Sequence, residues 1–251
     1  MFLKNFNHNF VILKVKVMKK LFKLIKSIIF FCIAALIAIC GYIVYDGYNM
    51  YKEAISSESI ESKIAKIENR QDYLSYDEIP KDFSNAIVAV EDRRFYMHGG
   101  YDIKSIARAF VKNIETKSLV EGGSTITQQL AKNLYFSFEK KFTRKVAELF
   151  VAIDIEKKYT KEQILSYYIS VIYFGDGYYG LESASIGYFS KRPDRLNFDE
   201  ITLLAGLPNA PSMYALTNNP DLARKRQAIV IEQMKECGYI TDDNLKEINE
   251  K

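Results

Sequence analysis

The chain has 251 residues, and its 35 basic and 31 acidic side chains give a formal net charge of +4. The charge is uneven: residues 1–26 hold seven lysines and no acid, residues 27–45 hold no charge, and the remainder carries 28 basic and 31 acidic side chains. Because this remainder is mildly acidic, the overall positive charge does not indicate a protein that binds nucleic acid. Two histidines and three cysteines exclude a Cys/His zinc cluster and a disulfide framework.

Residues 27–45 form an apolar run of nineteen residues. A helix of this length, at about 1.5 Å per residue, spans the ~30 Å hydrocarbon core of a membrane. A signal peptide usually has a shorter apolar run and a cleavage site of small residues, so we expect one retained transmembrane helix. The preceding lysines predict that residues 1–26 are a cytoplasmic tail and that the rest lies outside the membrane. Met18, which precedes two lysines, is as ordinary a start for a membrane protein as Met1.

The rest of the chain divides into a connector and one domain. Residues 46–72 are polar and charged, which predicts a short, partly helical connector. Three of its isoleucines stand at helical spacing, namely Ile60, Ile64 and Ile67. In residues 73–251 helical patterns dominate, strand patterns are scarce, and capping-box spacings predict helix starts at Thr160 and Asn197. We therefore expect a mainly α fold with one lobed domain.

Residues 85–100, NAIVAVEDRRFYMHGG, place two adjacent acids at the end of an apolar helical run. Burial and the negative end of a helix dipole both disfavour the charge of a carboxylate. Glu91 or Asp92 so placed can act as a general base near neutral pH, with Phe95 and His98 in the loop that follows. The alternative is a solvated cluster in which the acids only neutralise the two arginines after them.

Residues 121–136, EGGSTITQQLAKNLYF, predict a helix that begins after two glycines. Free backbone N–H groups and hydroxyls at such a helix start form an anion site. Four polar residues share one face of the helix, namely Thr125, Gln129, Lys132 and Asn133. A lysine two turns beyond hydroxyl and amide groups suits a phosphate or pyrophosphate, but a capped surface helix has the same pattern.

Residues 143–150, TRKVAELF, belong to another amphipathic helix. Its apolar stripe is Val146, Leu149, Phe150 and Ile153. Arg144 and Lys145 precede Glu148 by four and three residues, spacings at which helical side chains meet. Glu148 lies opposite the stripe, so the pattern leaves open whether it faces water or a cleft.

In order and wording these segments resemble the consecutive motifs of the peptidoglycan glycosyltransferases, the lipid II-polymerising domains of glycosyltransferase family 51. The matching segments, between about residue 73 and residue 238, are EDRRFYMHGGYD, GGSTITQQLAKNLY, RKVAE, KEQILSYYI and YFGDGYYG. Since the chain stops at residue 251, it resembles the monofunctional type that lacks a transpeptidase domain. The resemblance implies a mainly α, lysozyme-like, two-lobed catalytic domain after one transmembrane helix, with a smaller lobe that dips into the membrane.

The resemblance also implies an activity: polymerisation of lipid II into peptidoglycan strands by inverting β-1,4 glycosyl transfer, with release of undecaprenyl pyrophosphate. Glu91 matches the general base that deprotonates the acceptor 4-hydroxyl, and its supporting residues match Asp92, Phe95 and His98. Positions that contact substrate and pyrophosphate match Thr125, Gln129, Lys132 and Asn133. In the third motif Lys145, beside Arg144, matches a pyrophosphate contact, and Glu148 matches a residue that helps to stabilise the leaving group.

No organic cofactor is implied. A divalent ion, Mg²⁺ or Mn²⁺, stays open, because Asp92 and Glu148 alone are not a ligand set. The implied partners are lipid II, the growing glycan strand and the bacterial plasma membrane, together with penicillin-binding transpeptidases and proteins of division or elongation. No nucleic acid is expected.

Two positions depart from the family pattern: Ser166 and Ser170 stand where members usually carry Glu and Asn. These positions buttress the cleft, so the departures put packing or substrate handling in question and keep open a catalytically weakened scaffold for wall synthesis. A lytic muramidase of lysozyme-like fold is the other alternative. A hydrolase that acts on finished glycan needs no pyrophosphate site, which argues against it.

Overall fold

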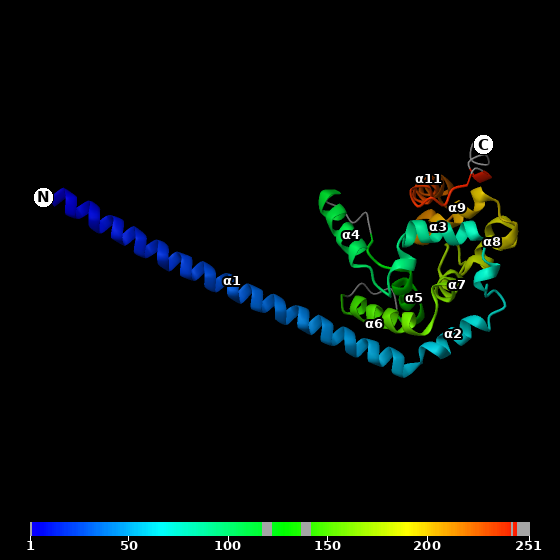
Figure 1. The fold of residues 1–251 in the computed structure, drawn as a ribbon, viewed down its shortest axis with the longest axis horizontal. Coiled ribbons are helices and arrows are strands. Elements are labelled where there is room, and N and C mark those ends of the chain that lie inside the picture. The colour runs from blue at the N-terminus through cyan, green and yellow to red at the C-terminus, as the bar shows by residue number, and fades with distance from the viewer. Residues whose placement is uncertain (1, 117–121, 137–141, 242, 245–251) are drawn as a thin grey trace.

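The computed structural model describes residues 2–116, 122–136, 142–241 and 243–244; the rest of the predicted domain, at 117–121, 137–141, 242 and 245–251, lies outside the described residues. The described residues form helices, with no strand among them beyond one isolated bridge between Tyr173 and Tyr179. The predicted mainly α fold is therefore confirmed. Figure 1 shows a long N-terminal helix that projects from a helical body.

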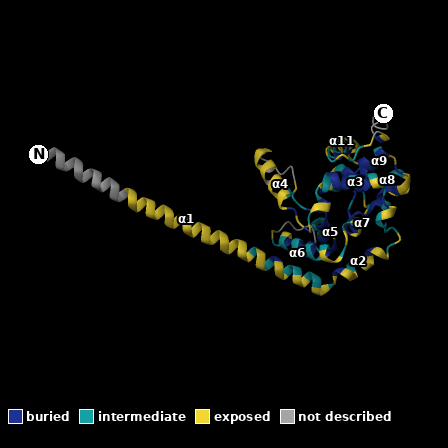
Figure 2. Ribbon diagram, viewed as in Figure 1, coloured by how far each residue is buried: buried dark blue, intermediate teal, exposed yellow. Residues whose placement is uncertain are grey.

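Helix α1, Phe2–Ser57, runs without a break through the predicted tail, the predicted membrane helix and the first part of the predicted connector. From Met18 onward α1 contains an apolar stretch of 18 residues with a mean hydropathy of 2.7, none of which is buried. Figure 2 shows this stretch as exposed. By length and composition α1 can cross a membrane, as the apolar run predicts.

The C-terminal turns of α1 pack on helix α6, Phe142–Lys158. The two backbones approach so closely that a Cβ added to Gly47 would lie 2.5 Å from the Cβ of Val146. The Tyr51 ring lies 5.5 Å from the ring of Phe150, and its hydroxyl donates to the Asp154 carboxylate at 2.5 Å. The first part of the predicted connector is therefore packed against the domain.

The second part of the predicted connector forms helix α2, Ile60–Glu68, which begins after the N-cap Ser59. Its three isoleucines are at most 4% exposed and belong to the main hydrophobic core. The helical spacing is confirmed. The predicted boundary at residue 73 does not coincide with a break in the packing, because α2 contributes to the same core as the helices after it.

The body is built around α3, α5, α7, α9 and α11, with α8 beside them (Figure 1), and the short α10 contacts α11. Capping boxes begin α5, α7 and α9, and the predicted starts at Thr160 and Asn197 are confirmed. The bounds are α3 Lys81–Glu91, α5 Ile126–Tyr135, α7 Lys161–Val171, α8 Leu181–Phe189, α9 Phe198–Gly206, α10 Pro211–Tyr214 and α11 Pro220–Glu236. Short 3-10 turns are Tyr76–Glu78, Phe95–Met97, Pro193–Arg195 and Leu207–Asn209.

Helix α4, Ile103–Thr116, projects from this body (Figure 1). Its exposed apolar side chains, between 47% and 68% accessible, are Ile103, Ile106, Val111 and Ile114. Exposed apolar residues gathered on one element indicate a surface that meets another apolar phase or partner. The arrangement is a large helical body with a smaller projecting part beside it.

Candidate active site

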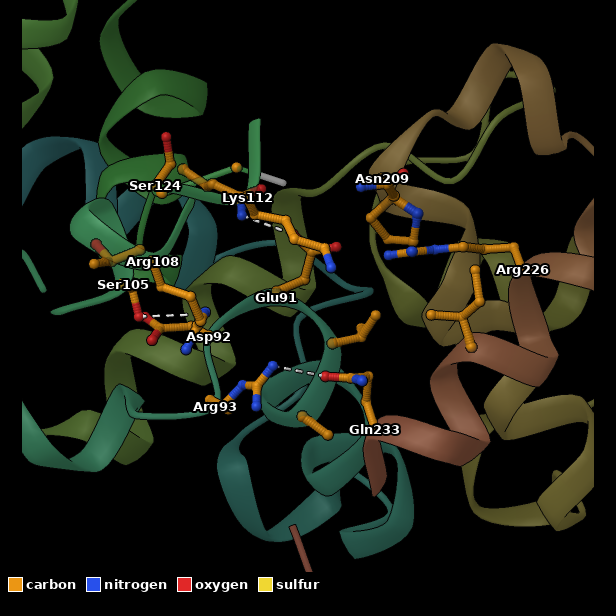
Figure 3. A pocket seen from close by; sticks show the side chains of 18 of the residues that line it. Glu91, Asp92, Arg93, Ser105, Arg108, Lys112, Ser124, Asn209, Arg226 and Gln233 are labelled. Carbon is orange, nitrogen blue, oxygen red and sulfur yellow. Dashed lines mark hydrogen bonds between the residues drawn. The ribbon is translucent and has the colours of Figure 1, made fainter. Parts of the chain in front are cut away.

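A cavity of about 870 Å³ lies between α3, α4, the start of α5, α6 and α11. Figure 3 shows Glu91 between two walls, with Arg108 and Lys112 of α4 on one side and Arg226 and Gln233 of α11 on the other. Six residues singled out in the sequence line it, namely Glu91, Asp92, Thr125, Gln129, Lys132 and Lys145. Segments that are distant in the sequence thus form one polar cavity.

Glu91 is the last residue of α3, a helix whose apolar side is buried in the core. Its Oε2 accepts a hydrogen bond of 2.8 Å from the Nε2 of Gln129 on α5. Its other oxygen, Oε1, is buried and has no hydrogen-bond partner among the described residues. One oxygen is therefore fixed, while the other retains its capacity to accept a proton.

Burial is the main influence on the Glu91 carboxyl and raises its pKa above the ordinary value. The Gln129 hydrogen bond and the charges of Arg226 and Lys132 act in the opposite direction, whereas the charge of Asp92 adds to the rise. A carboxyl group with a raised pKa is a stronger base than an ordinary surface carboxylate. The environment of Glu91 thus suits the predicted role of general base.

Asp92 holds the loop after α3 against the start of α5. It is 7% exposed, and its oxygens lie 3.0 and 3.1 Å from His98 Nε2 and accept the backbone N–H of Ile126 at 3.1 Å. Phe95, in the same loop, is fully buried, and the Lys161 ammonium lies 4.3 Å from its ring centroid. Phe95 and His98 do not line the cavity and have positions that support the loop.

Three of the four residues predicted on α5 line the cavity, and the fourth, Asn133, does not. Thr125 is the N-cap: it is 2% exposed and its hydroxyl donates to the carbonyl of Gly100 at 2.9 Å. Gln129 and Lys132 line the cavity, but Asn133 is exposed and lies outside its lining. Side chains on a helix tilt toward its N-terminus, so the long Lys132 reaches back to the cavity and the short Asn133, one residue further on, does not.

Glu148 faces neither water nor the cavity: it is fully buried. Its carboxylate accepts a hydrogen bond of 2.7 Å from Lys145 Nζ and lies 3.4 Å from Arg144 Nε. Lys145 is half-exposed, reaches the cavity and also donates to Ser124 Oγ at 3.2 Å. The structure thus places Glu148 behind Lys145, as the residue that holds this lysine, and Arg144 outside the cavity lining.

Cations gather on the α4, α5 and α6 side of the cavity. Burial lowers the pKa of Lys132, with the charges of Lys145 and Arg144 adding to this effect and those of the nearby acids opposing it. Arg108 and Lys112 of α4 line the same region. Several positive groups in a partly desolvated cavity favour the binding of an anion such as phosphate or pyrophosphate.

The sequence analysis missed the α11 wall and the basic side of α4. On α4 the signal was available, since Arg108 and Lys112 are four residues apart and share one helical face. Arg226 gave no such signal, because α11 reads as an ordinary charged helix. Its charge lowers the pKa of Glu91, and its Nε is buried with no hydrogen-bond partner among the described residues.

The residues present do not fit a divalent ion held by the protein. Among the described residues no group of three or more His, Cys, Asp or Glu side chains is placed to bind a metal. The two acids considered for this role are engaged elsewhere, Asp92 with His98 and Ile126, and Glu148 with Lys145. No step of the chemistry below is derived through a metal.

The family described as "Transglycosylase" matches residues 58–235. Penicillin-binding protein 1F of Bacillus subtilis is 40% identical over 90% of this chain, which spans 33% of that protein. The monofunctional glycosyltransferase of Staphylococcus aureus (strain JH9) is 39% identical over 75% of the chain and 72% of that protein. A putative transglycosylase of Cupriavidus necator is 44% identical over 68% of the chain and 73% of that protein.

The chain spans a third or less of the penicillin-binding proteins that it matches, such as 24% of penicillin-binding protein 1A of Aquifex aeolicus. The family match covers most of the chain and includes α2, consistent with the place of that helix in the core. The chain therefore belongs to the transglycosylase family.

Proposed function

We propose that this protein is a peptidoglycan glycosyltransferase that polymerises lipid II. One observation carries the proposal: Glu91 Oε1, which is buried and has no hydrogen-bond partner among the described residues, shares a cavity with a group of cations. An inverting glycosyl transfer needs a base on one side of the donor sugar and charge stabilisation for the leaving group on the other. Family membership and the name of the Staphylococcus aureus relative support the same reaction.

In the proposed reaction the 4-hydroxyl oxygen of the acceptor sugar attacks the anomeric carbon of the donor. Its proton passes to Glu91 Oε1, and the new β-1,4 bond forms as the bond from the anomeric carbon to the pyrophosphate oxygen breaks. The departing undecaprenyl pyrophosphate keeps the bonding electrons. Lys132 and Lys145 stabilise the negative charge of this leaving group, and Glu148 orients Lys145 through their 2.7 Å contact.

The membrane arrangement belongs to the same proposal. With seven lysines before the apolar run, the N-terminus lies in the cytoplasm and the catalytic domain on the outer side of the bacterial plasma membrane. The cavity then opens where a lipid-linked substrate resides. The names of the relatives suggest penicillin-binding transpeptidases as partners that use the polymer.

The decisive experiment incubates the purified full chain in detergent with labelled lipid II and separates the products by size. We expect long glycan strands from the wild type and at least a ~100-fold lower rate from Glu91→Gln, the usual contribution of a general base. The matched control is Glu232→Gln, an exposed glutamate of α11 outside the cavity lining. Near-normal polymer from Glu91→Gln rejects the base, and cleavage of finished glycan without polymer indicates a lytic enzyme.

A further inference from the structure

A chain of hydrogen bonds runs from the core of the body to Glu91. Tyr168 of α7 is fully buried, and its hydroxyl donates to Gln129 Oε1 at 3.1 Å. The Nε2 of the same Gln129 side chain donates to Glu91 Oε2 at 2.8 Å. The amide of Gln129 therefore links a core tyrosine to the proposed base, across three helices.

The direction of this chain follows from what each group can donate. An ionised carboxylate only accepts hydrogen bonds, so Gln129 must present its NH₂ group, not its carbonyl oxygen, to Glu91. The carbonyl oxygen then faces Tyr168 and needs a donor, which the tyrosine hydroxyl supplies. Burial and the nearby charges of Glu91 and Asp92 raise the pKa of Tyr168 well above its ordinary value, so this hydroxyl keeps its proton at every working pH.

We propose that Tyr168 is a positioning residue for catalysis: it fixes the orientation of the Gln129 amide, which in turn holds Glu91 Oε2 and leaves Oε1 as the oxygen that accepts the proton. This inference rests on the proposed function in one respect, namely the role of Glu91 as the base. The hydrogen bonds from Tyr168 to Gln129 and from Gln129 to Glu91 do not depend on that function. Without the hydroxyl, the Gln129 carbonyl oxygen loses its donor, and only the Glu91 carboxylate still orients the amide. A less constrained amide holds Glu91 Oε2 less firmly.

The charged and titratable groups that face Glu91 come from each element around it. They are Asp92 after α3, Lys132 on α5, Tyr168 on α7 and Arg226 on α11. Replacing Tyr168 by Phe changes none of the other three, and Phe keeps the ring that fills the core. A change in the titration of Glu91 in this variant is therefore attributable to the Gln129 contact.

The primary test follows the Glu91 carboxyl directly by carbon NMR. The full chain is labelled at glutamate carboxyl carbons in detergent micelles, and the Glu91 signal is assigned by its loss in Glu91→Gln. We expect Tyr168→Phe to raise the titration midpoint of Glu91 by about one pH unit, since a hydrogen bond to the charged form is weakened. In the pH profile of kcat/KM for strand synthesis, the midpoint on the acidic side should move to higher pH by the same amount. The rates at high pH should stay within about 3-fold of the wild type.

The chain offers a matched control in the neighbouring Tyr167. It is 1% exposed, and its hydroxyl donates to Glu68 Oε1 at 2.6 Å, away from the cavity. Tyr167→Phe removes a buried tyrosine hydroxyl from the same helix, so it reproduces any general loss of stability. We expect neither the Glu91 midpoint nor the midpoint on the acidic side of the kcat/KM profile to move in this variant.

The outcomes separate the two proposals. An unchanged Glu91 midpoint in Tyr168→Phe, or an equal shift in Tyr167→Phe, overturns the positioning role even if the wild type makes long strands. Absence of strands from the wild type rejects the proposed function, while the NMR titration still decides whether Tyr168 controls Glu91. If Tyr168→Phe does not fold, the test uses 3-fluorotyrosine at this position, whose hydroxyl is a stronger hydrogen-bond donor. The titration midpoint of Glu91 must then fall. An unchanged midpoint overturns the inference.

Discussion

Glu91 ends α3 with Oε2 bound to Gln129 and with Oε1 buried and without a hydrogen-bond partner among the described residues. Burial raises the pKa of this carboxyl in the folded chain. A group whose pKa is higher in the folded than in the unfolded state stabilises the fold at low pH, and this contribution is lost as the pH rises through the folded value. At neutral pH the charge of Glu91 therefore opposes folding, although the proposed reaction needs it.

This conflict predicts the effect of Glu91→Gln on stability. The variant should unfold at a higher temperature than the wild type at pH 8, by about 2–4 °C for each 1 kcal/mol of relieved destabilisation. The difference should disappear below about pH 4, where an ordinary glutamate is also protonated. Thermal unfolding of both proteins in detergent, at several pH values, measures it. A gain that is equal at pH 4 and pH 8 would show that the Glu91 charge is not its source.

Lys132 is also held in an environment that disfavours its charge, since burial lowers its pKa. In the proposed function this lysine binds the pyrophosphate, so Lys132→Ala should raise KM for lipid II by at least ~10-fold, the effect of losing one charge-assisted contact. The melting temperature should change little. Lys225→Ala, an exposed lysine on α11, is the control. A large fall in melting temperature with unchanged KM would assign Lys132 to folding instead of binding.

At the scale of elements, α7 shows how the two departures from the family pattern differ. The Ser166 hydroxyl donates to the backbone carbonyl of Leu74 at 2.5 Å and lies 3.2 Å from the hydroxyl of Tyr73. The Ser170 hydroxyl is buried and has no hydrogen-bond partner among the described residues. Ser166 is thus part of the packing between α7 and the segment after α2, whereas Ser170 leaves a polar group unsatisfied.

These two serines should respond in opposite ways to the same substitution. Ser166→Ala leaves the Leu74 carbonyl without its donor and should destabilise the fold by about 1–2 kcal/mol. Ser170→Ala removes a hydroxyl that forms no hydrogen bond with any described residue and should be neutral or slightly stabilising. Chemical unfolding of the two variants, side by side in the same detergent, makes the comparison. Equal destabilisation of both would mean that Ser170 has a partner in solution.

Helix α6 shows what periodicity predicts and what it misses. The predicted stripe exists, but its residues are half-buried and Val146 and Phe150 pack on α1. The fully buried face is the opposite one, which carries Glu148 together with Ala147 and Val151. Because this buried face includes a charged residue, a search for apolar residues at helical spacing does not identify it. The capping-box spacings predicted the starts of α7 and α9 correctly, because a capping box depends only on residues three positions apart.

At the scale of the whole molecule, the sequence predicted the parts of the site that lie in contiguous segments. Glu91, Gln129, Lys132 and Lys145 were recognised because each lies within a short, dense pattern, and the structure brings all four to one cavity. The wall formed by Arg226 on α11 is more than 100 residues from Glu91 and carries no local pattern. Its contribution arises only from packing between α3, α9 and α11.

Two exposed apolar surfaces among the described residues bear on the proposed access to a lipid-linked substrate. One is α1 from Met18 onward, and the other is the apolar side of α4, a helix whose polar side lines the cavity. Because α1 packs directly on α6, the proposed membrane arrangement keeps the domain close to the bilayer. In the proposed arrangement the apolar side of α4 enters the membrane surface, and the cavity next to it receives the lipid-linked sugar.

The last prediction tests that arrangement on the full chain. Replacing Ile103, Val111 and Ile114 together by Ser should raise KM for lipid II in vesicles by roughly 100-fold or more, since three side chains at about 1 kcal/mol each give about 3 kcal/mol. With a short-chain, water-soluble analogue of lipid II the same variant should differ from the wild type by less than about 3-fold, because no membrane contact is then involved. Ile186→Ser with Met213→Ser, two exposed apolar residues on α8 and α10, is the control and should leave both values unchanged. An equal rise in KM for both substrates would mean that α4 shapes the cavity itself and does not act through the membrane.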